Sequence, residues 1–127
     1  MIATNFYAAW LAILLGLISG TIQGLFFHDE NWLGGYGSWK RRMLRLGHIS
    51  FFGLAFLDLA FVMSASYLKL TEHEIVWTGR LVLVGLVTMP LVCYLAAIKK
   101  VFRHLFFVPV VSLLAGITIF ICKVMCR

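Results

Sequence analysis

Four long apolar segments dominate the sequence and leave few folds open to the chain. They cover residues 6–27, 46–68, 81–98 and 105–122. The first, third and fourth segments contain no Lys, Arg, Asp or Glu. About 20 apolar residues in a helix cross ~30 Å of hydrocarbon, and a helix bonds its own backbone polar groups inside a bilayer. The sequence therefore predicts an all-α membrane protein: a four-transmembrane-helix, up-and-down bundle with short loops. Residues 1–127 would form a single integral membrane domain.

The composition supports a lipid environment. The chain is 62% hydrophobic and 13% charged, whereas soluble domains are about half apolar and a quarter charged. Its net charge of +6 comes from basic residues at the edges of the apolar segments, where anionic headgroups attract them. We therefore expect membrane lipids as partners and no nucleic acid.

The orientation follows from the basic residues of the connections. Residues 1–27 contain no Lys or Arg, so the charged start of a signal peptide is missing and we expect a retained helix. The first and third connections hold seven basic residues and the other side holds four: Lys40, Arg41, Arg42, Arg45, Lys99, Lys100 and Arg103 against Lys69, Arg80, Lys123 and Arg127. The positive-inside rule then places those two loops in the cytoplasm and both termini on the non-cytoplasmic side.

Small residues recur at every fourth position of the first segment: Ala8, Ala12, Gly16, Gly20 and Gly24. This spacing is typical of helices that approach another helix closely in a membrane. The contact would lie inside the chain or with a partner. Gln23 lies beside these residues, and we expect it to form a hydrogen bond across helices.

The connection over residues 28–45 is rich in aromatic, glycine and basic residues. It lacks a phosphate-binding motif, and Ser38 is a plausible N-cap for a long helix that ends near Lys69. We expect an exposed link over residues 69–80. The basic collar is predicted to anchor the helix to lipid or to bind an acidic partner, and it consists of Trp39, Lys40, Arg41, Arg42 and Arg45.

Asp58 is the least expected residue in the chain. It follows His48 by ten residues and precedes Leu68 by ten, which places it near the bilayer midplane. A charge there costs at least about 3 kcal/mol, so the carboxyl group must face the interior, be paired or be protonated. We expect Thr88 and Ser112 as hydrogen-bond partners. The residue is interpreted either as a structural contact between helices or as a proton or cation carrier.

Three histidines are predicted to gather at one membrane face: His28, His48 and His104. Two of them could ligate a b-type haem axially, and a metal site with Asp29 and Glu30 is a second possibility. Neither arrangement has a diagnostic spacing, and histidines are ordinary at membrane interfaces. We therefore favour an interfacial role for them.

No set of residues in the sequence indicates an enzyme. The serines lack a His and Asp arrangement, and Cys122 and Cys126 lack the spacing of redox sites, so we interpret them as free thiols. The first hypothesis is a non-catalytic accessory subunit of a larger membrane complex, docked through the small residues of the first helix and the basic collar, or a self-associating chain. The alternatives are a haem-binding electron-transfer subunit and an oligomeric proton-coupled transporter that uses Asp58.

Overall fold

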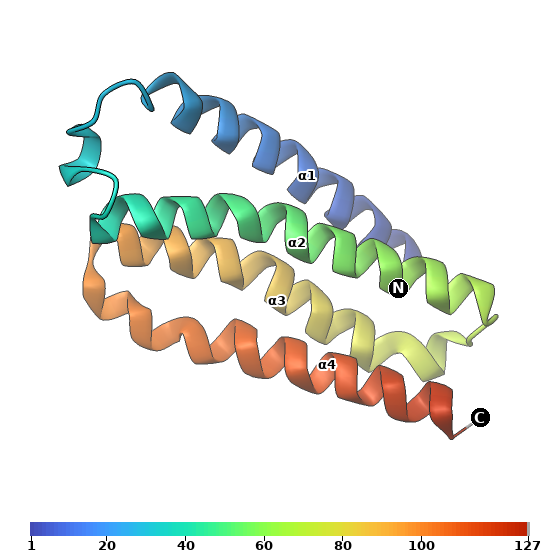
Figure 1. Cartoon of the computed structure of the whole chain (residues 1–127). Coiled ribbons are helices and arrows are strands. Elements are labelled where there is room, and N and C mark those ends of the chain that lie inside the picture. The colour runs from blue at the N-terminus through green and yellow to red at the C-terminus, as the bar shows by residue number, and fades with distance from the viewer. Residues whose placement is uncertain (127) are drawn as a thin grey trace.

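The protein consists of long helices that run alternately up and down (Figure 1). The computed structural model describes residues 1–126, which form α1 (Ile2–Leu25), η1 (Trp32–Gly34), α2 (Trp39–Tyr67), α3 (Glu72–Ile98), η2 (Lys100–Phe106) and α4 (Phe107–Met125). Within this range, α1, α2, α3 and the η2–α4 segment are each long and apolar enough to cross a membrane. The predicted four-helix architecture is thereby confirmed, and it fits an integral membrane protein. Arg127, counted above with the less basic face, lies outside the described residues.

The helices lie side by side in chain order (Figure 1). α2 packs against α1 and α3, and α4 packs against α3. α1 also reaches α3, whereas no Cα atom of α4, over its described length, lies within 8 Å of one in α1 or α2. Both chain ends lie at one end of the bundle, which we call the terminal end. The opposite end, which holds the connections at residues 26–38 and 99–106, is the loop end.

α2 begins where the sequence predicts. The Ser38 hydroxyl accepts a hydrogen bond from the backbone N–H of Arg41 at 3.2 Å, which satisfies one of the free donors of the first turn. The same hydroxyl donates to the carbonyl oxygen of Leu33 at 2.8 Å. Ser38 therefore ties the start of α2 to the preceding loop.

The predicted exposed link over residues 69–80 is wrong from Glu72 onward. α3 begins at that residue, and Thr71 caps it in a capping box with Glu74. Thr78, near the end of the expected link, is completely buried. The acidic residues suggested a loop, but carboxylates are also favourable in the first turn of a helix, where they face its positive end.

The apolar core has two parts. The part at the terminal end contains Phe61, Val62, Ala65, Leu70 and Ile75. The ring of Phe61 meets that of Phe120 edge to face, with 5.5 Å between centroids, so this part joins α2 to α4. The other part lies where α1, α2 and α3 meet and contains Ala9, Ala12, Ala55 and Leu86. Its alanines let α1 lie close to α2.

Candidate functional site

Asp58 lies at the junction of three helices. It is completely buried in α2, and its Oδ1 accepts a hydrogen bond of 2.7 Å from Nδ2 of Asn5 in α1. The same amide nitrogen donates to the carbonyl oxygen of Gly79 in α3 at 3.1 Å. Both hydrogens of one amide group therefore join α1 to α2 and to α3. We call Asn5, Asp58 and Gly79 the polar clamp.

The clamp depends on the missing side chain of Gly79. A Cβ atom at this position would lie 3.1 Å from Oδ1 of Asn5 and 2.6 Å from Cγ of Met1. Real Cβ atoms essentially never lie under 3.0 Å from another heavy atom. Glycine at position 79 therefore lets the start of α1 reach the backbone of α3.

Two oxygen atoms of the clamp lack a donor. Oδ1 of Asn5 and Oδ2 of Asp58 have no hydrogen-bond partner in the described structure. No Lys or Arg of residues 1–126 pairs with Asp58. Because an unpaired charge is costly at this depth, these surroundings suit a neutral carboxyl group, whose proton would supply a donor.

The partners expected for Asp58 are wrong. The Thr88 hydroxyl donates to Val84 in its own helix at 2.6 Å, and Ser112 donates to Leu81, which joins α4 to α3, also at 2.6 Å. Asn5 takes their place. It was missed because the first apolar segment was taken to begin at the next residue, Phe6.

Gln23 does form a hydrogen bond across helices. Its amide nitrogen donates to the carbonyl oxygen of Leu44 in α2 at 3.4 Å and to the Ser19 hydroxyl at 3.0 Å. The Ser19 hydroxyl is in turn hydrogen-bonded to that of Tyr94. These contacts join α1 to α2 and α3 near the loop end.

The small residues of α1 pack inside the chain. A Cβ atom on Gly16 would lie 3.0 Å from the Phe52 ring, and one on Gly20 would lie 2.5 Å from Cε1 of His48, whereas Gly24 faces open space. The buried residues of α1 are Asn5, Ala9, Ala12, Gly16 and Gln23.

The buried face of α1 thus departs from the predicted every-fourth spacing. In a helix each four-residue step turns about 40° past a full turn, so five residues at that spacing drift around the helix. The observed alternation of four and three keeps one face toward α2. Of the predicted row, Ala8 to Gly20 packs against the rest of the chain and Gly24 does not.

The three histidines do not form one site. His28 and His104 are exposed, and Nδ1 of His28 donates to the carbonyl oxygen of Leu25 at 3.0 Å. The His48 ring packs edge to face on Phe52, with 5.3 Å between centroids. Its contact with Gly20 leaves no room for a planar haem between α1 and α2 at this point.

The metal site considered as a second possibility around Asp29 and Glu30 has no support in the described residues. Within residues 1–126 no group of three or more His, Cys, Asp or Glu side chains is placed to hold a metal ion. Oδ1 of Asp29 instead accepts from the backbone N–H of Asn31 at 2.9 Å. Cys122 and Cys126 are exposed and unpaired.

No protein-family model, curated protein or solved structure matches this chain. Its function must therefore be inferred from the arrangement of its own residues.

Part of the basic collar is used to hold the loop. The guanidinium of Arg41 is buried among the rings of Phe27, Trp32 and Tyr36, with 5.4 to 5.7 Å to each centroid. Arg45 stacks on Tyr36 at 3.9 Å. These cation–π contacts fold the aromatic loop back onto α2.

The rest of the collar lies at the surface or on α3. Trp39 donates from Nε1 to the carbonyl oxygen of Ala96 at 2.7 Å, which fixes the start of α2 against the end of α3. Lys40 and Arg42 are exposed. These two side chains are free to meet lipid headgroups or a partner.

Proposed function

We propose that this small membrane protein is a non-catalytic structural subunit of a larger membrane complex. The observation that carries the proposal is the polar clamp. The carboxyl group of Asp58 accepts from the Asn5 amide, which joins three helices of the same chain, and Asp58 lines none of the cavities described below. A carboxyl group in that position supports packing rather than transport.

The outer faces of the bundle support assembly with other subunits. α4 packs mainly against α3 and α1 packs mainly against α2, and both helices expose large apolar side chains over their length. The small residues Gly16 and Gly20, expected to dock a partner, are already covered by α2. Another membrane subunit would therefore meet the outer face of α1 or α4, and the exposed Arg42 would meet acidic groups at the loop end.

The two alternative functions have less support. A proton-coupled transporter requires Asp58 to exchange its proton with water, but the residue is 0% exposed. A haem held by His48 requires an open face on that ring, but the ring is packed against Gly20 of α1, and Nδ1 of His28 is bonded to the backbone of its own chain segment. An absorption spectrum of the purified protein tests the haem alternative, since bound haem would give a Soret band.

The orientation in the membrane remains a prediction from charge. The loop end carries the larger number of basic residues, so we place it in the cytoplasm and both termini on the other side. This placement is tested with single cysteines introduced at Tyr36 and at Tyr67, one at each end of the bundle. Each is labelled with an impermeant maleimide in intact cells and in inverted membrane vesicles.

The subunit role is tested by the mass and composition of the native particle. The tagged chain is expressed at its natural level, extracted in a mild detergent and separated on a native gel, and the particle is analysed by mass spectrometry. We expect other membrane proteins in a fixed ratio and a mass far above the 14.4 kDa of the chain. A particle that contains only copies of this chain would contradict the proposal.

A further inference from the structure

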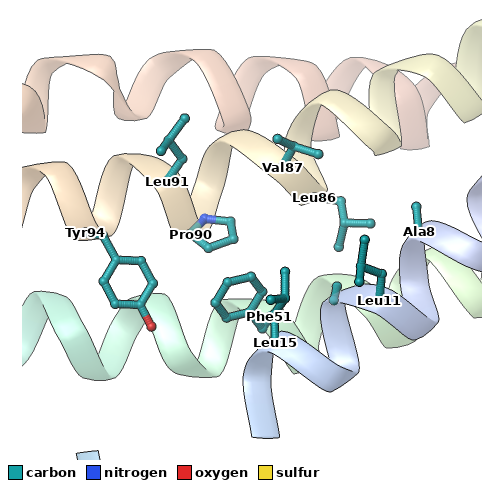
Figure 2. A pocket seen from close by; sticks show the side chains of 10 residues that line it. Ala8, Leu11, Leu15, Phe51, Leu86, Val87, Pro90, Leu91 and Tyr94 are labelled. Carbon is teal, nitrogen blue, oxygen red and sulfur yellow. The ribbon is translucent and has the colours of Figure 1, made fainter. Parts of the chain in front are cut away.

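A groove lined by hydrocarbon runs along the bundle between α1 and α3, with α2 at its base. Figure 2 shows its inner part, where Leu11 and Leu15 of α1, Phe51 of α2 and Pro90 of α3 surround a cavity of about 330 Å³. A second cavity of about 360 Å³ continues it toward the loop end. The two cavities share Leu15, Phe51 and Tyr94, so they form one groove.

The few polar groups along this groove are already bonded to each other. The hydroxyls of Ser19 and Tyr94 share a hydrogen bond, and the Gln23 amide donates to Ser19 and to the backbone of Leu44. An occupant of the groove therefore meets a hydrocarbon surface. It needs no hydrogen-bonding groups of its own along this length.

The loop end of the groove is cationic. Two further hollows continue past Tyr94 and Leu44; Lys40 lines both of them and Lys100 lines the outer one. No acidic side chain lines any of the four hollows. The acidic residues of the loop end are Asp29 and Glu30, which lie in the exposed loop. The seven basic residues of the two connections at this end outnumber them. An anionic group would therefore be attracted to the mouth of the groove.

The groove is long enough to hold one acyl chain. Its lining on α1 runs from Ala8 to Gln23, which is about 22 Å at 1.5 Å per residue. Half of a hydrocarbon core is about 15 Å, so the acyl chain of a phospholipid whose headgroup lies at the loop end can be held along its length.

We propose that the α1–α3 groove binds an anionic phospholipid of the surrounding membrane. One acyl chain of the lipid lies against Leu15, Phe51 and Tyr94, and the lipid phosphate lies between Lys40 and Lys100. This site is distinct from the subunit role proposed above. An isolated chain would hold the lipid as well as a chain in a complex.

The site is tested by native mass spectrometry of the detergent-solubilised protein titrated with dioleoylphosphatidylglycerol or dioleoylphosphatidylcholine. Leu15→Trp fills the groove where its two cavities meet. Leu14→Trp is the matched control, because Leu14 is a neighbouring exposed leucine outside the groove. In the same way Lys100→Gln removes a charge at the mouth and Lys99→Gln removes one beside it.

We expect one phosphatidylglycerol to bind tightly and phosphatidylcholine to bind at least tenfold more weakly. Leu15→Trp should abolish the tight binding and Leu14→Trp should not. Lys100→Gln should weaken it about fivefold, and Lys99→Gln should have a smaller effect. Thermal unfolding of each variant shows whether it is folded, and Leu15→Phe is a milder filling variant should the Trp form be unstable.

Three results would overturn the proposal. Equal binding of the two lipids would show that the headgroup charge is not recognised. Equal effects of Leu15→Trp and Leu14→Trp in folded proteins would show that lipid binds outside the groove. Crosslinking of a cysteine at Leu15 to another protein in the native membrane would show that a partner occupies the groove.

Discussion

The two ends of the bundle hold α1 by side chains of different length. At the terminal end the short side chain of Asn5 bonds directly to Asp58 and to the backbone of Gly79. Nearer the loop end α1 is joined to α3 through the long Tyr94 side chain, which meets Ser19. Accordingly α1 contacts both α2 and α3 at Asn5, whereas a groove separates α1 from α3 near Ser19.

This difference shows that polar contacts between membrane helices do more than satisfy buried groups. Apolar side chains have little preference between lipid and a neighbouring helix, so the length of a polar bridge sets the local distance between helices. The clamp closes the terminal end. The Ser19–Tyr94 hydrogen bond, which we call the tyrosine bridge, spans the groove that separates α1 from α3 toward the loop end, which we call the open end. Substitutions at the two ends should therefore have unequal effects.

The largest effect is expected from adding a side chain at the closed end. Gly79→Val forces the valine into Asn5 and Met1 and should lower the free energy of unfolding by about 2–3 kcal/mol. Gly24→Val is the matched control at the open end, because nothing lies within 4 Å of its Cβ position. Unfolding in mixed micelles with increasing SDS measures both variants. Equal losses would remove the distinction between the ends.

Removing the acceptor of the clamp should have the next largest effect. Asp58→Leu leaves one N–H of the Asn5 amide without its acceptor and should cost about 1–2 kcal/mol. Asp58→Asn keeps an oxygen for that bond and should cost less than half as much. The same unfolding titration compares the two variants. A larger loss for Asn than for Leu would contradict a hydrogen-bonding role.

A smaller effect is expected where His48 fills the space beside Gly20. Gly20→Ala requires the imidazole ring to move, since the new Cβ would lie 2.5 Å from it, and should destabilise by about 1 kcal/mol. The double variant with His48→Ala should lose less than the sum of the single losses, because the ring that clashes is gone. Additive losses would show that the two residues do not share this contact.

The smallest effect is expected at the tyrosine bridge. Ser19→Ala and Tyr94→Phe each remove one partner of the hydrogen bond. A double-mutant cycle should give a coupling energy near 0.6 kcal/mol, the average for hydrogen bonds between membrane helices. A parallel cycle on Asn5 and Asp58 gives the coupling energy of the clamp. If the Ser19–Tyr94 coupling energy were the larger of the two, the tyrosine bridge would stabilise the protein more than the clamp does, against this prediction.

The sequence predicted the four helices well because hydrophobic length alone determines which segments cross a bilayer. It also identified Ser38 as a cap, since that signal is local. The start of α3 was missed because Glu72 and Glu74 resemble loop residues until the capping box with Thr71 is seen.

The candidate site was predicted only in part. Asp58 is conspicuous in an apolar segment, but its partner is set by how α1 crosses α2 and α3. Asn5 lies 53 positions away in the chain, and hydropathy placed it outside the first segment. The row of buried residues from Asn5 through Ala9, Ala12 and Gly16 was the available signal. The groove depends on the separation of α1 and α3, which a single sequence does not contain.

The central claim is that Asp58 supports packing in a chain whose role is structural. The most direct test is recovery of the native particle from cells that express the wild-type chain, Asp58→Asn or Asp58→Leu at equal levels, with a growth assay alongside. We predict that the wild-type and Asn chains are recovered with the same partner subunits in equal yield and support equal growth, whereas the Leu chain is recovered poorly. Either a wild-type particle made only of this chain or a folded Asn variant that fails to support growth would contradict the claim.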